Sequence, residues 1–284
     1  MTQRGARGWL DERGAAIFPP PPGDIAPLST AEVCATVPEV LKRLQAEGFP
    51  QAAAGTYLAG WLPASPSYLV GALYAETGAG LSVTAKDLRW WLHDEGWTTG
   101  LAVASPATIL VGPDHPWSGQ PEVRTLRNDA AVRQATVTAL IDSVGTLVEA
   151  IQVASRAGVV GLWHEVSDAL ANSLGERTDA VRPEEVERLR ALVSVPQRPW
   201  KRLPRIELVE SAHGPVSVCH RGGCCQSFTL TGAADDYEPD ELERAFELAF
   251  PRAADEPDYC GNCKFRSFDD VVNRRLWRCA QERV

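Results

Sequence analysis

Two cysteine pairs in the last quarter of the chain constrain its fold more than any other feature. Cys224 and Cys225 are adjacent within the glycine-containing segment 220–226, and Cys260 and Cys263 form a C-x-x-C pair around a glycine. Glycine lets the backbone turn tightly, and C-x-x-C spacing lets two thiolates converge on one inorganic site. Adjacent side chains splay apart, so the vicinal pair can bind one site only from bent, irregular backbone. The pattern therefore predicts a small metal centre near the C-terminus.

The rest of the composition narrows the kinds of site that these cysteines can form. The chain has 284 residues, enough for one large domain or two small ones, and its net charge of -9 argues against a nucleic-acid surface. We find no secretory signal, and no apolar stretch reaches the roughly 20 residues of a membrane-spanning helix, so we expect a cytoplasmic protein without a membrane span. In that reducing compartment, clustered cysteines more often bind metal or do redox work than form structural disulfides. Six of the seven cysteines follow residue 218, which favours a site over a scattered framework.

The apolar pattern predicts an α+β fold that is predominantly helical, with short antiparallel strands and a small C-terminal cysteine-rich metal-binding module. We expect an irregular proline-rich arm at 1–28, a mostly helical body with a central hairpin at 29–196, and the cysteine module at 197–284. The proline-bearing stretch 196–204 marks the boundary between body and module.

Within the body, the first expected helix follows a Ser29-Thr30 cap and ends before Gly48 and Pro50. Five apolar residues recur in it at helical spacing: Val33, Val37, Val40, Leu41 and Leu44. The remaining body is expected to contain mostly helix at 57–92, two strands around Ser105-Pro106 at 99–112, a long helical region at 127–175 broken near Gly158, and a short helix at 183–193.

The module is expected to begin with two short strands, at 205–210 and 215–219, and to contain a third candidate strand at 226–231. Apolar residues at four-residue spacing predict a helix at 238–250. A second helix, capped by Ser267, is predicted at 267–283.

Spacing alone leaves three interpretations of the cysteines open. Four thiolates can hold a [2Fe-2S] cluster with two thiolates on each iron, or a tetrahedral structural zinc ion, or no metal at all. Zinc is the commonest meaning of a C-x-x-C pair, and Cys219 with Cys224 would supply a C-x4-C half for a zinc knuckle. Most four-cysteine zinc sites use two C-x-x-C pairs, however, and the upstream half here is a vicinal pair.

The cysteine motifs also resemble a known family. The segment 221–228, Arg-Gly-Gly-Cys-Cys-Gln-Ser-Phe, followed by 259–263, Tyr-Cys-Gly-Asn-Cys, resembles the C-terminal signature of the ferric-siderophore reductases, the FhuF-like proteins. The stretch 161–170 is similar to the tryptophan-bearing helix of that family. One departure is the length of the connection between the pairs, because Thr229 to Asp258 intervene where family members have a much shorter segment.

The resemblance implies a cytoplasmic protein with a [2Fe-2S] cluster on Cys224, Cys225, Cys260 and Cys263, which reduces the Fe(III) of imported siderophores, often hydroxamates, to Fe(II). No dinucleotide or flavin fingerprint is present, so the electrons are expected from a donor protein such as a ferredoxin or flavoprotein. Two alternatives remain: a non-enzymatic siderophore-binding protein with structural zinc, and a [2Fe-2S] electron carrier or redox sensor.

Several other residues bear on the site. Arg221, Lys264 and Arg266 flank the cysteine pairs and are candidates for binding an anionic ferric chelate or the electron donor, although solvated surface charges would look the same. His220 is a possible ligand, but histidine in such clusters usually replaces two cysteines together. Cys34 and Cys279 are expected in helices as packed residues, and Cys219 either packed or beside the cluster. Five tryptophans could line an aromatic pocket, or simply pack in the core: Trp90, Trp91, Trp97, Trp117 and Trp163.

Overall fold

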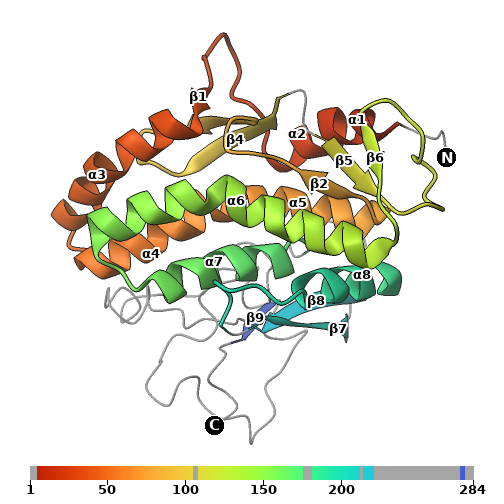
Figure 1. Ribbon diagram of the computed structural model, residues 1–284. Helices are drawn as coiled ribbons and strands as arrows, with labels where there is room; N and C mark the ends of the chain where they lie inside the picture. Colours follow the sequence, from red (N-terminus) through yellow and green to blue (C-terminus); the bar gives the residue numbers. More distant parts are fainter. Residues whose placement is uncertain are drawn as a thin grey trace, which may run out of the picture.

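The computed structural model describes residues 5–104, 108–174, 181–201, 203–211, 214–220 and 276–278. Within these ranges the protein is α+β and predominantly helical, with short strands that mostly pair antiparallel, as the sequence predicted (Figure 1). The main helices are α3 (Thr30–Ala46), α4 (Gln51–Trp61), α5 (Ala64–Thr77), α6 (Asp129–Ser155), α7 (Val159–Ala171) and α8 (Pro183–Val193). The cysteine-rich segment 221–275 lies outside the described residues.

Helix α3 forms where the sequence predicted it. The Ser29 hydroxyl accepts a hydrogen bond from the Glu32 N–H, and the Glu32 carboxylate accepts one from the Ser29 N–H, which together make a capping box. All five apolar residues predicted at helical spacing are buried, and they face the core that α3 shares with α4 and α6.

Helix α6 is the longest element and packs against α3, α4, α5 and α7. Asn128 caps its first turn, and Arg156, in the left-handed conformation, ends it close to the predicted break. Among the described residues, α6 is the one helix long and apolar enough to cross a membrane. This is weak evidence for a span, because the core helix of a soluble protein meets the same criteria.

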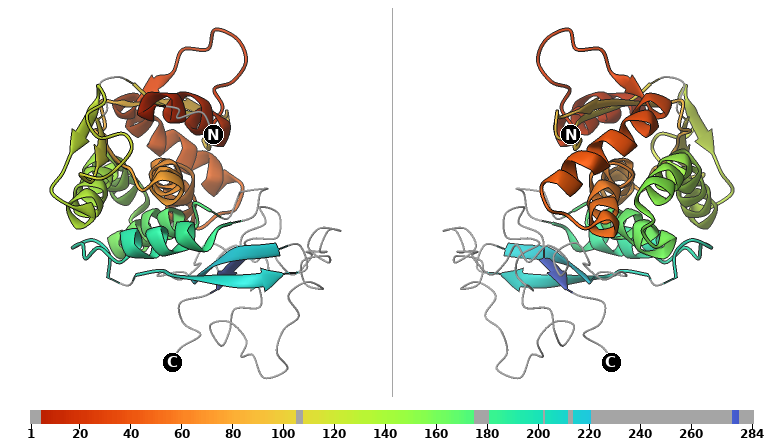
Figure 2. Two further views of the ribbon diagram at one scale, coloured as in Figure 1. Left: turned by 90° about the vertical axis from the view of Figure 1, so that its right-hand side faces the viewer. Right: turned by 90° about the vertical axis from the view of Figure 1, so that its left-hand side faces the viewer.

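Nine strands form three small sheets within the described residues. The first is β1 (Leu28–Ser29), β3 (Leu88–Leu92) and β4 (Thr98–Val103), in the order β1-β3-β4. The second is β2 (Gly80–Ser82), β5 (Thr108–Val111) and β6 (Val123–Thr125). The third is β7 (Arg205–Ser211), β8 (Gly214–His220) and β9 (Leu276–Arg278). The first two sheets lie on one side of the helices and the third lies on the opposite side (Figures 1 and 2).

The predicted helix over the second half of 57–92 was wrong. Helix α5 ends at Thr77, and the chain then forms strands β2 and β3. In β3, Leu88 and Trp90 are buried, whereas Arg89 between them is only partly buried, which is the alternation of a strand with one face on the core. The closely spaced apolar residues Leu88, Trp91 and Leu92 are compatible with a helical face, and pairing with β1 and β4 decides for the strand.

The predicted central hairpin at 99–112 was also wrong in its pairing. Both strands exist, as β4 and β5, but β4 pairs with β3 and β5 pairs with β2, so they belong to different sheets. The hairpin of this region is β3–β4, whose turn is at residues 93–97. Ser105 and Pro106 lie outside the described residues.

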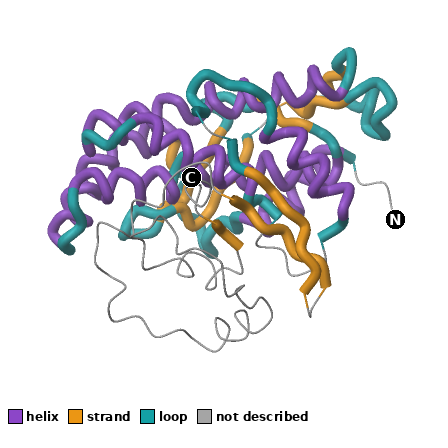
Figure 3. Tube along the Cα trace, turned by 90° about the horizontal axis from the view of Figure 1, so that it is seen from below, coloured by secondary structure: helices purple, strands orange, loops and turns teal. Residues whose placement is uncertain are grey.

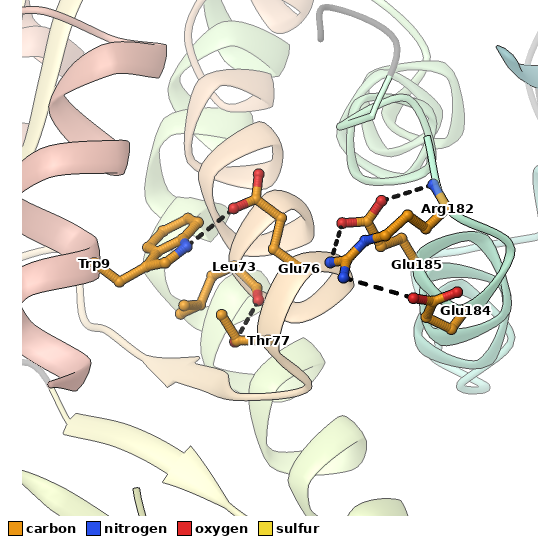
Figure 4. A network of polar contacts seen from close by, with 7 residues as sticks. All are labelled: Trp9, Leu73, Glu76, Thr77, Arg182, Glu184 and Glu185. Atoms are coloured by element: carbon orange, nitrogen blue, oxygen red, sulfur yellow. Dashed lines mark hydrogen bonds and ion pairs between the residues drawn. The ribbon is translucent and has the colours of Figure 1, made fainter. Parts of the chain in front are cut away.

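The N-terminal arm is not irregular throughout. Ala6–Ile17 is helical, as α1 (Ala6–Trp9), a π-helical turn (Leu10–Gly14) and α2 (Ala15–Ile17). Its buried residues Ala6 and Leu10 join the main core, and the Trp9 indole N–H donates to the Glu76 carboxylate on α5 at 3.0 Å (Figure 4). Burial of this apolar face therefore anchors the arm, and irregular backbone follows it up to β1.

Candidate metal centre

The segment that carries every predicted ligand connects two strands of the β7-β8-β9 sheet. Strands β7 and β8, both predicted from the sequence, pair as an antiparallel hairpin (Figure 3). Ile206 lies opposite Cys219, and Leu208 lies opposite Ser217. Strand β9 pairs with β8 in parallel, with Val218 opposite Leu276. Parallel neighbours need a crossover connection, and here that connection is 221–275.

One face of this sheet is fixed to the helical body. Ile206 is 1 % exposed and Cys219 is 0 % exposed, and both belong to the same hydrophobic core as the helices. The Arg190 Nε of α8 donates to the Ile206 carbonyl at 2.7 Å. The boundary expected near 196–204 thus separates segments that share one core, and the β7–β8 hairpin is packed on the helical body up to the end of β8 at His220.

The start of α8 is set by a buried carboxylate. Glu185, in its first turn, is 0 % exposed and forms an ion pair with Arg182 at 2.7 Å (Figure 4). The same carboxylate accepts the Arg182 backbone N–H at 2.9 Å. A negative charge at a helix N-terminus is favourable, so this contact orients the helix on which the third sheet packs.

The predicted site residues themselves lie outside the described residues: Cys224, Cys225, Cys260, Cys263, Arg221, Lys264 and Arg266. All seven belong to the single connection between β8 and β9. Cys279 also lies outside the described residues, and of His220 the backbone position in β8 is described.

The helix predicted at 267–283 was wrong where it can be compared. Leu276–Arg278 forms strand β9 on the edge of β8. An edge strand leaves a row of backbone N–H and C=O groups that another segment can satisfy, and this pairing outweighs the helical periodicity of the local sequence.

The two cysteines that the structure describes, Cys34 and Cys219, both contribute to the hydrophobic core. Cys219 is buried opposite Ile206, on the sheet face that packs on the helices. Cys34 is half-buried on α3 and packs against the core; burial raises the pKa of its thiol, and a hydrogen bond with Thr146 acts in the opposite direction. The raised pKa of Cys34 and the complete burial of Cys219 are unlike a reactive thiol and agree with packed cysteines.

Helix α7 carries buried polar residues that the sequence analysis did not single out. His164 is 8 % exposed, Asp168 is 0 % exposed and Asn172, at the end of the helix, is 2 % exposed. They recur every four residues, and helical periodicity places His164 and Asp168 on the opposite half of α7 from Leu162 and Val166. The sequence feature that could have indicated these buried polar residues is their four-residue spacing on the side of the helix opposite an apolar stripe.

Neither the described side chains nor the comparisons with known proteins identify a metal site or a family. Across 5–104, 108–174 and the shorter described ranges after them, no group of three or more His, Cys, Asp or Glu side chains could hold a metal ion. No protein-family model matches the chain, and no curated protein matches it. The resemblance to the FhuF-like proteins therefore rests on the cysteine motifs and on the stretch 161–170.

Proposed function

We propose that this chain is a cytoplasmic ferric-siderophore reductase with a [2Fe-2S] cluster on Cys224, Cys225, Cys260 and Cys263. The observation that carries the proposal is the donor set, two pairs of thiols within one connection. A [2Fe-2S] cluster needs four thiolates, two on each iron, and these pairs supply that number and grouping. The described cysteines, Cys34 and Cys219, pack in or against the hydrophobic core, so neither competes with the motif cysteines as a ligand.

The proposed reaction needs little from the protein besides binding. Siderophores hold Fe(III) through hard oxygen ligands and hold Fe(II) less tightly because its charge is lower, so one-electron reduction releases the iron. A cluster ligated by four cysteines supplies single electrons at low potential. The chain has a net charge of -9, so an anionic partner needs a local positive region. Such a region would be formed by Arg221, Lys264 and Arg266, and it would attract an anionic chelate or an acidic donor protein such as a ferredoxin or flavoprotein. Hydroxamate siderophores are the proposed substrate class.

The burial of Cys219 weakens one form of the zinc alternative. A zinc knuckle built on Cys219 and Cys224 needs the Cys219 thiolate at the metal. Cys219 is 0 % exposed among apolar neighbours, and drawing it out would remove it from the core. A zinc site on the four motif cysteines, in a siderophore-binding protein, is the remaining form of that alternative.

Replacement of one proposed ligand tests the assignment. Cys225→Ser should reduce bound iron from about two atoms per chain to almost none and remove visible charge-transfer absorption, since one thiolate is lost. Cys34→Ser is the matched control, because Cys34 lies on α3, and it should keep its iron. Metal analysis and electron paramagnetic resonance of freshly reduced protein give the readout. A colourless wild-type protein with stoichiometric zinc would exclude the reductase.

Anaerobic mixing separates the reductase from a carrier or sensor. The dithionite-reduced, desalted protein should convert a ferric hydroxamate chelate to Fe(II), trapped by a ferrous-specific dye, at a rate that rises with protein concentration. Reoxidation of the protein without Fe(II) formation would identify a carrier or sensor instead.

A further inference from the structure

A cleft of about 370 Å³ lies on the side of the molecule away from the β7-β8-β9 sheet. It is formed between the β3–β4 hairpin and residues 19–27, which we call the strap and which connect α2 to β1 (Figures 1 and 2). Pro21 and Ile25 line it from the strap, and Trp91, Leu92 and Thr99 line it from the hairpin. Ligand sites typically have a volume of this order and a mostly apolar lining with a few polar groups.

The strap is held at both ends and across its middle. The Leu101 N–H donates to the Phe18 carbonyl at 3.4 Å, and β1 pairs with β3 at the other end. Between them, the Trp91 indole N–H donates to the Ile25 carbonyl at 2.8 Å. A Cβ at Gly100 would lie 2.9 Å from the Pro19 carbonyl oxygen, so the strap passes over β4 where glycine leaves room for it. These contacts preform the cleft.

One end of the cleft is polar. His93 and Asp94 line it there. The His93 Nδ1 accepts a hydrogen bond from the Glu95 N–H at 3.2 Å, so the neutral ring carries its proton on Nε2 and offers an N–H donor. The His93 ring is stacked on Trp97, with centroids 3.8 Å apart and planes 6° apart, which fixes its orientation. The Asp94 carboxylate supplies acceptors.

The two polar groups of the lining favour an uncharged ligand. An anionic ligand would be repelled by the Asp94 carboxylate, and an ammonium ligand would offer no acceptor to the His93 Nε2–H. A neutral ligand that both donates and accepts hydrogen bonds satisfies the polar end without a charge conflict.

We propose that this cleft binds a neutral, flat aromatic molecule bearing a phenolic hydroxyl, with the ring against Trp91 and the hydroxyl between His93 and Asp94. The phenol O–H donates to the carboxylate and its oxygen accepts from the Nε2–H. Aromatic rings pack on one another more favourably than saturated rings of equal size. The helical layer lies between the cleft and the β7-β8-β9 sheet (Figure 1), and the proposal for the cleft does not depend on the proposed function.

A set of matched probes tests the proposal on the full chain by equilibrium dialysis. 2-Naphthol should bind once per chain, whereas 2-naphthoate, 2-naphthylmethylammonium and decahydro-2-naphthol should each bind at least about tenfold more weakly. Compared with 2-naphthol, the first analogue carries a negative charge, the second carries a positive charge, and the third has saturated rings that are not flat. Absence of saturable 2-naphthol binding, or equal binding of any of these analogues, overturns the proposal.

Variants locate the bound probe. Trp91→Leu should weaken 2-naphthol binding about tenfold or more, through loss of ring contact and of the bond to Ile25. Ile25→Asp keeps the assay informative if Trp91→Leu fails to fold, because the Ile25 side chain is 58 % exposed yet lines the cleft, and it should weaken binding similarly. Val153→Ser, at an exposed site on α6, is the control and should bind as the wild type does. Wild-type affinity in the folded Ile25→Asp variant would place the probe elsewhere and overturn the proposal.

Discussion

The capping box of α3 shows how much two side chains contribute where a helix begins. Glu32 accepts hydrogen bonds from both the hydroxyl and the backbone N–H of Ser29. These bonds, the side-chain one first, lower the pKa of Glu32 from its ordinary value, with a smaller contribution from Arg89. The ionised carboxylate is therefore the form that stabilises the folded state.

The capping box makes stability depend on pH in a definite direction. A lowered folded-state pKa stabilises above the ordinary pKa of glutamate, and this contribution disappears as the pH falls through the lowered value. Ser29→Ala should reduce the melting temperature by about 2–4 °C at pH 7, and the difference from wild type should shrink below about pH 4.

Glu32→Gln serves as the control for this pH effect. Glutamine keeps the capping-box geometry without an ionisable group, so its stability relative to Ser29→Ala should not follow the same acid transition. Differential scanning calorimetry from pH 3 to pH 7 provides the comparison. A constant difference between Ser29→Ala and wild type across that range would contradict the role of the Glu32 charge.

At the scale of elements, α4 and α6 cross at a point where a side chain on one helix would not fit. A Cβ at Gly55 of α4 would lie 2.2 Å from the Ser155 Oγ of α6. Ser155 is held in place, because its hydroxyl donates to the Ile151 carbonyl at 2.6 Å and accepts the Ala157 N–H at 3.1 Å. The crossing therefore depends on the absence of a side chain at Gly55.

Two glycine-to-alanine changes in helices should consequently have opposite effects. Gly55→Ala should lower the free energy of unfolding by about 1–3 kcal/mol, because the helices must separate and this cost exceeds the gain in helix propensity. Gly145→Ala, in α6 with nothing within 4 Å of its Cβ, should raise it by about 1 kcal/mol. Urea denaturation measures both. If Gly55→Ala is as stable as Gly145→Ala, the α4–α6 contact is wrong.

For the whole molecule, the residues that the structure describes already form one continuous hydrophobic core. It runs from Ala6 through the helices and the first two sheets to Ile206 and Cys219. The apolar area buried in such a core supplies most of the stability of a domain.

Loss of the proposed cluster should therefore leave the body folded. Cys263→Ser, and wild-type protein stripped of metal by a chelator, should keep nearly all of the far-ultraviolet helical circular dichroism and a cooperative thermal transition. The untreated wild type is the reference. Loss of the helical signal on metal removal would show that the described core does not fold without the metal and would favour the structural-zinc alternative.

The helices could be predicted because their signals are local. The Ser29 cap with the five apolar residues of α3, and the Pro183 start of α8, depend on residues within a few turns of one another. The cysteine motif was likewise visible from spacing alone.

The pairing of strands was decided by distant segments. Leu88–Leu92 and Leu276–Arg278 have apolar spacings compatible with helix, and become strands because β1, β4 and β8 offer backbone partners. The strap over Trp91 depends on space above Gly100, which no short stretch of sequence encodes. The amino-acid sequence by itself thus determined helices such as α3 and α8 and the spacing of the cysteine motif, since both follow from neighbouring residues. Only the tertiary structure decided strand partners, buried polar positions and the cleft, because these depend on which distant surfaces exclude water together.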